Sequence, residues 1–119
     1  MKEPNTLIEK IVEGLQEKKA KNIVIADMSE IDDAAFRYFV ICEGTSTTQV
    51  SAIGDNMIDY VREQANVRPY GYDGFQNAQW VAVDFGDTIV HVFIPEFRAF
   101  YKLEQLWADA KLTQIPDLD

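Results

Sequence analysis

Apolar residues recur three or four positions apart in three stretches of the chain, which predicts three helices. At the start of the first stretch Thr6 and Glu9 have the spacing of a capping box, and Ser46 and Gln49 repeat it in the second. Pro69 disfavours helical geometry in the residue before it, so the second helix should stop near Asn66. The pattern predicts helices over residues 6–19, 46–66 and 97–110.

Runs rich in β-branched and aromatic residues lie between these helices and predict strands. The first run is apolar on both faces, which is typical of a buried parallel strand. Pro69 marks its own run as an edge strand, because proline cannot donate a hydrogen bond to a neighbouring strand. The expected strands span residues 22–27, 36–43, 69–74 and, as a hairpin, 80–94.

Helices interleaved with strands indicate an α/β fold, with a mixed sheet of about five strands packed with helices. No Gly- or Pro-rich linker divides the sequence, so we expect a single domain over residues 1–110. Residues 111–119 are polar and end in acidic side chains. We expect them to form a loosely held acidic tail.

The hairpin over residues 80–94 carries the most specific local signal. Gly86 and Asp87 lie between two β-forming runs and are the kind of pair that a two-residue turn requires. The turn sets the register, because side chains along a strand alternate between two faces. One face then pairs Val83 with Val90 and suits a core. The other face pairs Trp80 with Phe93, Ala82 with His91 and Asp84 with Ile89.

We interpret this second face as a docking surface, since an apolar core does not suit Asp, His and Trp side by side. Aromatic side chains are enriched at the centre of protein interfaces, and charges lie at the rim. Trp80 beside Phe93 is the expected anchor, and Asp84 and Asp73 offer carboxylates to Arg or Lys. The candidate binding residues are Trp80, Phe93, Ala82, Asp84, His91, Asp73, Tyr70 and Tyr72.

Two plainer interpretations of the same residues remain open. In the first interpretation, Trp80 fills a core between the sheet and a covering helix. In the second, His91 forms a local hydrogen bond with Asp84.

Composition narrows the class of partner. The chain has 119 residues and a net charge of −9, so phosphate backbones repel it and a basic protein attracts it. We therefore expect little direct contact with nucleic acid. The sequence contains no apolar run of the roughly 20 residues that a membrane helix needs, and its N-terminus lacks the apolar core of a signal peptide. Cytoplasmic residence is the expectation.

Catalytic chemistry finds little support in the sequence. A single cysteine, Cys42, excludes an intramolecular disulfide and a cysteine-rich zinc site, and a single histidine, His91, leaves little for any other zinc site. We expect a buried thiol and no cofactor. The strongest alternative is a phosphate held at Gly44-Thr45-Ser46, where a helix begins. Nucleotidyltransferases use a related Gly-Ser junction, but the pair of carboxylates one residue apart that holds their metal ions does not follow this one.

Three motifs resemble those of the ribosomal silencing factor (RsfS, Iojap-like) family, over roughly residues 7–110. The first is the strand-to-helix signature over residues 39–46, followed by Gln49-Val50. The second is the hairpin, and the third lies in residues 98–110. The chain departs from the family at Arg37, where many members carry an Asp.

This resemblance implies a non-enzymatic inhibitor of translation with a nucleotidyltransferase-like α/β core. It implies binding to a basic protein of the large ribosomal subunit, ribosomal protein fourteen, on the face that meets the small subunit. Occupying that face would block subunit joining and lower translation when nutrients are short. The resemblance also implies a homodimer off the ribosome, and a permanent homodimer with no ribosomal partner is the competing use of the same aromatic face.

Overall fold

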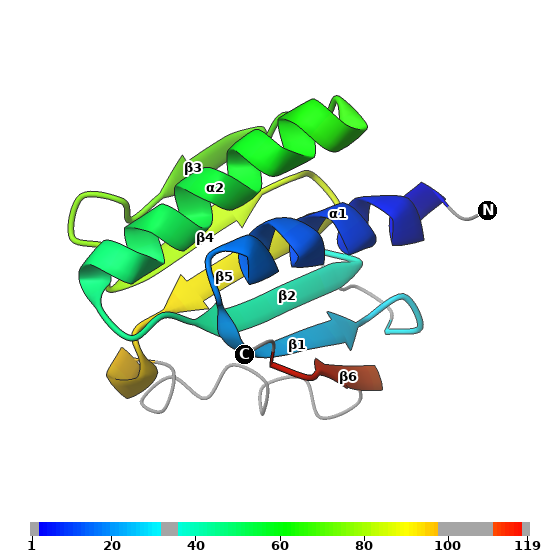
Figure 1. Cartoon of the computed structure of the whole chain (residues 1–119). Helices are drawn as coiled ribbons and strands as arrows, with labels where there is room; N and C mark the ends of the chain where they lie inside the picture. The colour runs from blue at the N-terminus through cyan, green and yellow to red at the C-terminus, as the bar shows by residue number, and fades with distance from the viewer. Residues whose placement is uncertain (1–2, 32–35, 98–110, 118–119) are drawn as a thin grey trace.

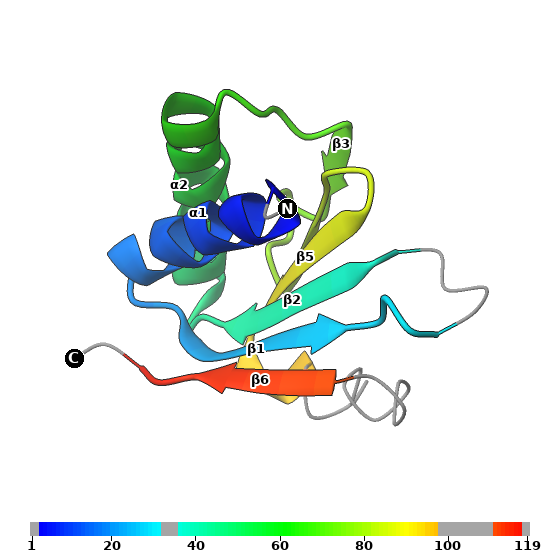
Figure 2. The ribbon, with the colours of Figure 1, turned by 90° about the vertical axis from the view of Figure 1, so that its right-hand side faces the viewer.

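The computed structural model describes residues 3–31, 36–97 and 111–117, and it shows two helices against one face of a six-stranded sheet (Figures 1 and 2). The strand order is β3-β4-β5-β2-β1-β6. The helices are α1 (Glu3–Glu17) and α2 (Thr47–Ala65). The strands are β1 (Lys21–Asp27), β2 (Tyr38–Glu43), β3 (Gly71–Asp73), β4 (Trp80–Asp84), β5 (Thr88–Phe93) and β6 (Lys111–Ile115).

The sheet is mixed, as expected. β2 and β5 are parallel, and all other neighbouring strands are antiparallel. The predicted α/β class is therefore confirmed, with six strands where about five were expected. The prediction that β1 is a parallel strand is wrong, since it lies antiparallel to both β2 and β6. A strand buried on both faces reads as continuously apolar whichever way its neighbours run.

The α2 helix has the ends that the sequence predicts. Ser46 is the N-cap, and its hydroxyl accepts a hydrogen bond from the Gln49 backbone N–H at 3.1 Å. Asn66 closes the helix in the left-handed conformation, with its N–H bonded to the carbonyl of Arg62. One side of the helix carries the buried residues Val50, Ile53, Gly54, Met57 and Val61.

The two helices are joined by polar contacts above the core. Asn56 of α2 donates to the carbonyl of Gly14 in α1 at 3.0 Å, and the Tyr60 hydroxyl donates to Glu13 at 2.6 Å. This contact lowers the pKa of Glu13 and raises that of Tyr60 to about 12, because the hydrogen bond favours the ionised carboxylate and the protonated phenol. The main core lies between the helices and the sheet and contains Cys42, which is buried as expected.

The C-terminal part corrects one prediction. Residues 111–115 were expected to be a loosely held tail, but they form β6 and pair with β1 from Ile23↔Ile115 to Asp27↔Lys111. Ile115 packs against the main core, and Lys111 forms an ion pair with Glu30 at 3.0 Å. The sequence did not reveal this strand, because most of its side chains are exposed, as is typical of an edge strand, and it lacks a clear apolar pattern.

Two further expectations concern helices. Apart from Phe97, the helix expected over residues 97–110 lies outside the described residues. Neither helix that the structure describes is long and apolar enough to cross a membrane.

The N-cap generates a stability prediction. Replacing Ser46→Ala removes the acceptor of the Gln49 N–H and should lower the free energy of unfolding by about 1 kcal/mol. Thr48→Ala is the matched control, since Thr48 is exposed in the same turn and does not act as the cap. Urea denaturation measures both variants. Equal midpoints for Ser46→Ala and wild-type protein would contradict the assigned cap.

Candidate functional site

The turn between β4 and β5 has the geometry that the sequence predicts. Gly86 adopts a φ of 101°, which side chains other than glycine rarely tolerate, and Phe85 N–H donates to the Thr88 carbonyl at 2.8 Å. The Asp84 side chain accepts a hydrogen bond from Gly86 N–H at 2.7 Å. The turn therefore holds the hairpin in one register.

The register of β4 and β5 confirms the predicted pairs from Trp80↔Phe93 through Ala82↔His91 to Asp84↔Ile89. Val81, Val83, Val90 and Val92 face the helices in the main core. Trp80, Ala82, Asp84, His91 and Phe93 alternate with them and lie on the opposite side, which we call the outer face.

Four rings form a row across the outer face, which we call the aromatic row: Trp80 of β4, His91 and Phe93 of β5, and Phe39 of β2. Trp80 stacks on Phe93 with centroids 5.0 Å apart, and His91 stacks on Phe39 at 5.4 Å. His91 and Phe93 lie 5.9 Å apart. Phe93 and Ile41 are the fully buried centre of this second, smaller core.

Trp80 is half-buried and keeps contact with solvent. The indole is therefore not wholly inside the protein, and the helix expected to cover it lies, beyond Phe97, outside the described residues. Phe93 and His91 differ from it: Phe93 is fully buried and His91 is 6% exposed. The prediction that these two side chains contact a partner directly is corrected, because both are buried and contact Trp80 instead: Phe93 stacks on the indole, and His91 accepts its hydrogen bond. Burial of Phe93 depends on neighbours such as Ile41 and Phe97, which the hairpin pattern does not contain.

His91 bonds to Trp80 and not to Asp84. The indole Nε1–H donates to His91 Nδ1 at 2.9 Å. An indole nitrogen can only donate, so Nδ1 carries no proton and the neutral ring is protonated at Nε2. Burial lowers the pKa of His91 to about 4, since the charged imidazolium would lose its hydration.

The protonated Nε2 of His91 is buried and has no hydrogen-bond partner in the part of the chain that the structure describes. A buried donor without a partner costs about 1–3 kcal/mol. Its neighbours in the aromatic row are the rings of Trp80, Phe39 and Phe93. The imidazole is therefore held in a predominantly apolar place at a cost to stability.

Two of the predicted carboxylates lie on the outer face beside this row. Asp73 is exposed on the edge strand β3, directly opposite Ala82, and Asp84 lies further along β4. One oxygen of each accepts a backbone N–H, from Gly74 at 2.9 Å and from Gly86 at 2.7 Å. The geometry supports the prediction that Trp80, Ala82, Asp84 and Asp73 share one surface.

The two predicted tyrosines are exposed, but Tyr72 does not share the outer face. Tyr70 is 83% exposed and Tyr72 is 64% exposed. Tyr72 pairs with Val83, whose side chain faces the helices, and its ring meets Phe75 edge-on at 5.4 Å. Tyr70 lies against the turn, where a Cβ added at Gly86 would come within 2.8 Å of its ring. The prediction that both extend the patch is corrected: Tyr72 lies on the helix side, and Tyr70 contacts the hairpin turn.

Sequence reasoning missed Phe39. Its ring lies on His91, because β2 and β5 are parallel neighbours with Phe39 opposite Ile89. The alternation Phe39-Val40-Ile41 signals a two-faced strand, but nothing local indicates that this strand pairs with β5. The same pairing separates Cys42 from His91, since Cys42 packs in the main core on the helix side. They cannot act as a catalytic pair.

The Gly44-Thr45-Ser46 junction is occupied by the protein's own side chains. Gln49 Oε1 accepts hydrogen bonds from the Thr45 N–H at 2.5 Å and the Thr45 hydroxyl at 2.7 Å. Its amide nitrogen donates to the Lys18 carbonyl at 3.1 Å. Together with the Ser46 cap, these bonds use the backbone N–H groups of Thr45 and Gln49, which are two of the donors that a phosphate at this junction would need.

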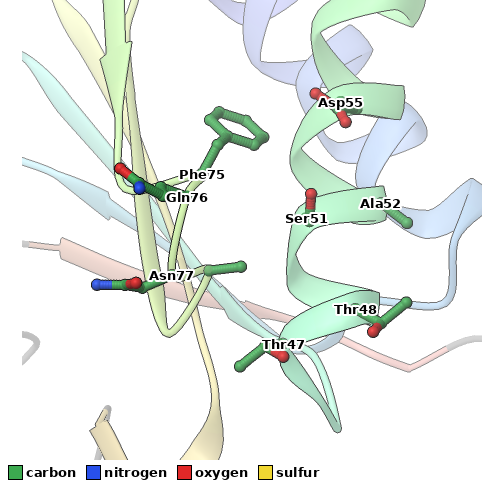
Figure 3. A pocket seen from close by; sticks show the side chains of 9 residues that line it. Thr47, Thr48, Ser51, Ala52, Asp55, Phe75, Gln76 and Asn77 are labelled. Atoms are coloured by element: carbon green, nitrogen blue, oxygen red, sulfur yellow. The ribbon is translucent and has the colours of Figure 1, made fainter.

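A shallow groove of about 440 Å³ lies beyond this junction, between α2 and the loop from β3 to β4. Figure 3 shows the Phe75 ring directed toward α2, while the amides of Gln76 and Asn77 lie on the far side of the loop. A Cβ at Gly54 would lie 2.8 Å from the Phe75 ring, so glycine allows this close approach. The groove carries the carboxylate of Asp55 and no basic side chain, which disfavours an anionic ligand. Among residues 3–31, 36–97 and 111–117, no cluster of His, Cys, Asp and Glu could hold a metal ion.

Comparisons with known proteins match the chain to one family. A sequence model of the family "RsfS: Ribosomal silencing factor during starvation" matches residues 1–119. The ribosomal silencing factor RsfS of Bacillus subtilis is 41% identical over 99 residues, covering 83% of this chain and 82% of that protein. A crystal structure of a protein from Chromobacterium violaceum is similar with a TM-score of 0.81 and 32% identity, covering 87% of this chain and 84% of that one.

A more distant relative comes from mouse. The protein "Mitochondrial assembly of ribosomal large subunit protein 1" of Mus musculus is 32% identical over 114 residues. The match covers 91% of this chain and 50% of the mouse protein.

The buried imidazole generates a pH prediction. The folded pKa of His91 lies below its usual value of 6.5, so the unfolded chain takes up the proton first. The stability that depends on neutral His91 is complete above pH 6.5 and is lost as the pH falls toward 4. Between pH 7 and pH 4.5, wild-type protein should lose about 2–3 kcal/mol more than His91→Leu.

Urea denaturation of both proteins at the two pH values measures this difference. The carboxylates, including Glu13 with its lowered pKa, are common to both proteins and cancel. An equal loss in the two proteins would show that His91 titrates normally.

Proposed function

Because the chain belongs to the RsfS family of ribosomal silencing factors, we propose that it binds the large ribosomal subunit, prevents the small subunit from joining and thereby represses translation. The description of the family ties this silencing to starvation. The name of the mouse relative, which refers to assembly of the large ribosomal subunit, supports the choice of this subunit. In this proposal the protein occupies a surface of the large subunit, and it needs only a docking surface of its own to do so.

The observation that carries the proposal is the composition of the outer face. Trp80 is partly exposed and stacks on a buried ring, as an interface anchor does. Ala82 beside it leaves room for an incoming side chain. Asp73 and Asp84 each keep an oxygen that the described backbone bonds do not use. This surface suits a protein that presents an apolar group flanked by Arg or Lys.

The partner that we propose is ribosomal protein fourteen of the large subunit, a basic protein on the face that meets the small subunit. The net charge of −9 supports a basic protein partner, because opposite charges speed the encounter and like charges repel rRNA phosphates. Direct contact with nucleic acid is correspondingly small. We propose that the homodimer uses the same outer face off the ribosome, so the dimer and the ribosome compete for it.

Co-sedimentation with purified large subunits tests the proposal. Wild-type protein should pellet with large subunits at low salt and should reduce the yield of joined ribosomes when small subunits are added. Pelleting should weaken as salt rises, since rim charges contribute to the encounter. Protein that stays in the supernatant at low salt would refute ribosome binding and leave a homodimer as the use of this face.

The anchor is tested separately with Trp80→Ala. Removing a central aromatic anchor should weaken binding to the large subunit by about 2 kcal/mol or more, which is about thirtyfold in Kd. Trp80→Glu should abolish the inhibition of subunit joining. Tyr72→Ala is the matched control, because Tyr72 is also an exposed aromatic residue but lies on the helix side of the sheet.

The control should bind as wild-type protein does. A folded Trp80→Glu protein that still blocks subunit joining would remove Trp80 from the interface. Circular dichroism and the urea midpoint establish that each variant is folded.

A further inference from the structure

We infer that His91 is a positioning residue of the docking surface: it holds the indole of Trp80 in one orientation, so that a partner meets the ring of Trp80 and not its N–H group. The inference rests on the proposed function, and it adds which chemistry of Trp80 the partner uses. His91 itself is buried and does not touch the partner.

The first step is the hydrogen bond between the two side chains. Trp80 Nε1–H donates to His91 Nδ1 at 2.9 Å, across the antiparallel pair β4–β5. The indole has one donor and no acceptor, and this bond uses that donor inside the protein. A carbonyl or carboxylate of the partner therefore finds no hydrogen bond at Trp80.

The second step is the stacking that fixes the remaining freedom of the indole. Trp80 lies on the buried ring of Phe93 at 5.0 Å, with an angle of 26° between the planes. Phe93 thus covers one ring face and His91 holds the N–H edge. The exposed part of Trp80 belongs to what remains of the ring, which attracts apolar groups and cations.

The third step is the charge beside this ring. Asp73 lies opposite Ala82, one alternation along the outer face from Trp80. Arginine combines a long apolar stem with a cationic head, which suits an indole that has a carboxylate on the same face of the sheet. We therefore assign the position over Trp80 to an Arg side chain of a basic partner protein.

The fourth step compares histidine with leucine at position 91. Leucine would fill a similar volume without the buried Nε2–H that lacks a partner among the described residues. The aromatic row around His91 contains rings and no charged group: Phe39 on β2, Phe93 on β5 and Trp80 on β4. What imidazole provides and leucine does not is the Nδ1 acceptor. The benefit of histidine is thus the fixed indole.

The hydrogen bond is tested directly by NMR of the Trp80 indole N–H. The chain has two tryptophans, and Trp107→Phe assigns the signals. In wild-type protein at pH 7 the Trp80 indole proton should exchange with water far more slowly than that of free tryptophan. Fast exchange in wild-type protein would overturn the inference without the need for any variant at His91.

Two variants of similar volume then separate positioning from packing. Asn places a polar group near the position of Nδ1, so His91→Asn can restore an acceptor, whereas His91→Leu cannot. The indole proton should stay protected in His91→Asn and lose protection in His91→Leu. Binding to purified large subunits should weaken about tenfold in His91→Leu and about threefold or less in His91→Asn, as expected for one hydrogen bond.

The outcomes distinguish this inference from the function on which it rests. If wild-type protein fails to bind large subunits, the proposed function and the inference fall together. If wild-type protein binds and His91→Leu binds equally well while its indole proton has lost protection, only the inference falls. If an Arg-rich model peptide quenches Trp80 fluorescence in wild-type protein but not in His91→Leu, the assigned partner chemistry is supported.

Discussion

The fixed register of the β4–β5 hairpin is the constraint on which the rest of the structure depends. The turn at Gly86 admits one pairing, and a shift by one residue would send Trp80 into the main core and the valines outward. The Asp87 carbonyl extends the effect to the next strand, because it accepts hydrogen bonds from the backbone N–H groups of Arg37 and Tyr38. The turn thus helps to place β2 alongside β5, and with it Phe39.

The two faces of the sheet are built on different principles. On the helix side, aliphatic residues of the strands meet the apolar stripes of α1 and α2 in one continuous core. On the outer face the aromatic row forms a second, smaller core in which Trp80 is only partly buried. A large ring that is held by its neighbours loses little further conformational freedom when it binds a partner.

The buried imidazole of His91 lowers the stability of the folded protein. A buried donor without a hydrogen-bond partner in the described part of the chain, and a pKa lowered to about 4, are both signs of a polar group in an apolar place. The single contact that explains its presence is the indole of Trp80. In a member of a family of ribosomal silencing factors, this contact fits the docking surface proposed above.

Local interactions are what the sequence by itself determined. The hairpin register, the Ser46 cap and the Asn66 end of α2 were predictable because each depends on residues within a few positions of one another. The composition also indicated a basic protein partner, since charge adds up without regard to fold.

Only the tertiary structure decided the rest, because it depends on which distant strands become neighbours. The pairing of β2 with β5 brought Phe39 onto His91, and the pairing of β1 with β6 turned an expected tail into an edge strand. Burial of Phe93 beneath Trp80 likewise depends on Ile41 from β2. Side-chain alternation tells which residues share a face, but the solvent exposure of each residue on that face is set by neighbours that the local pattern does not specify.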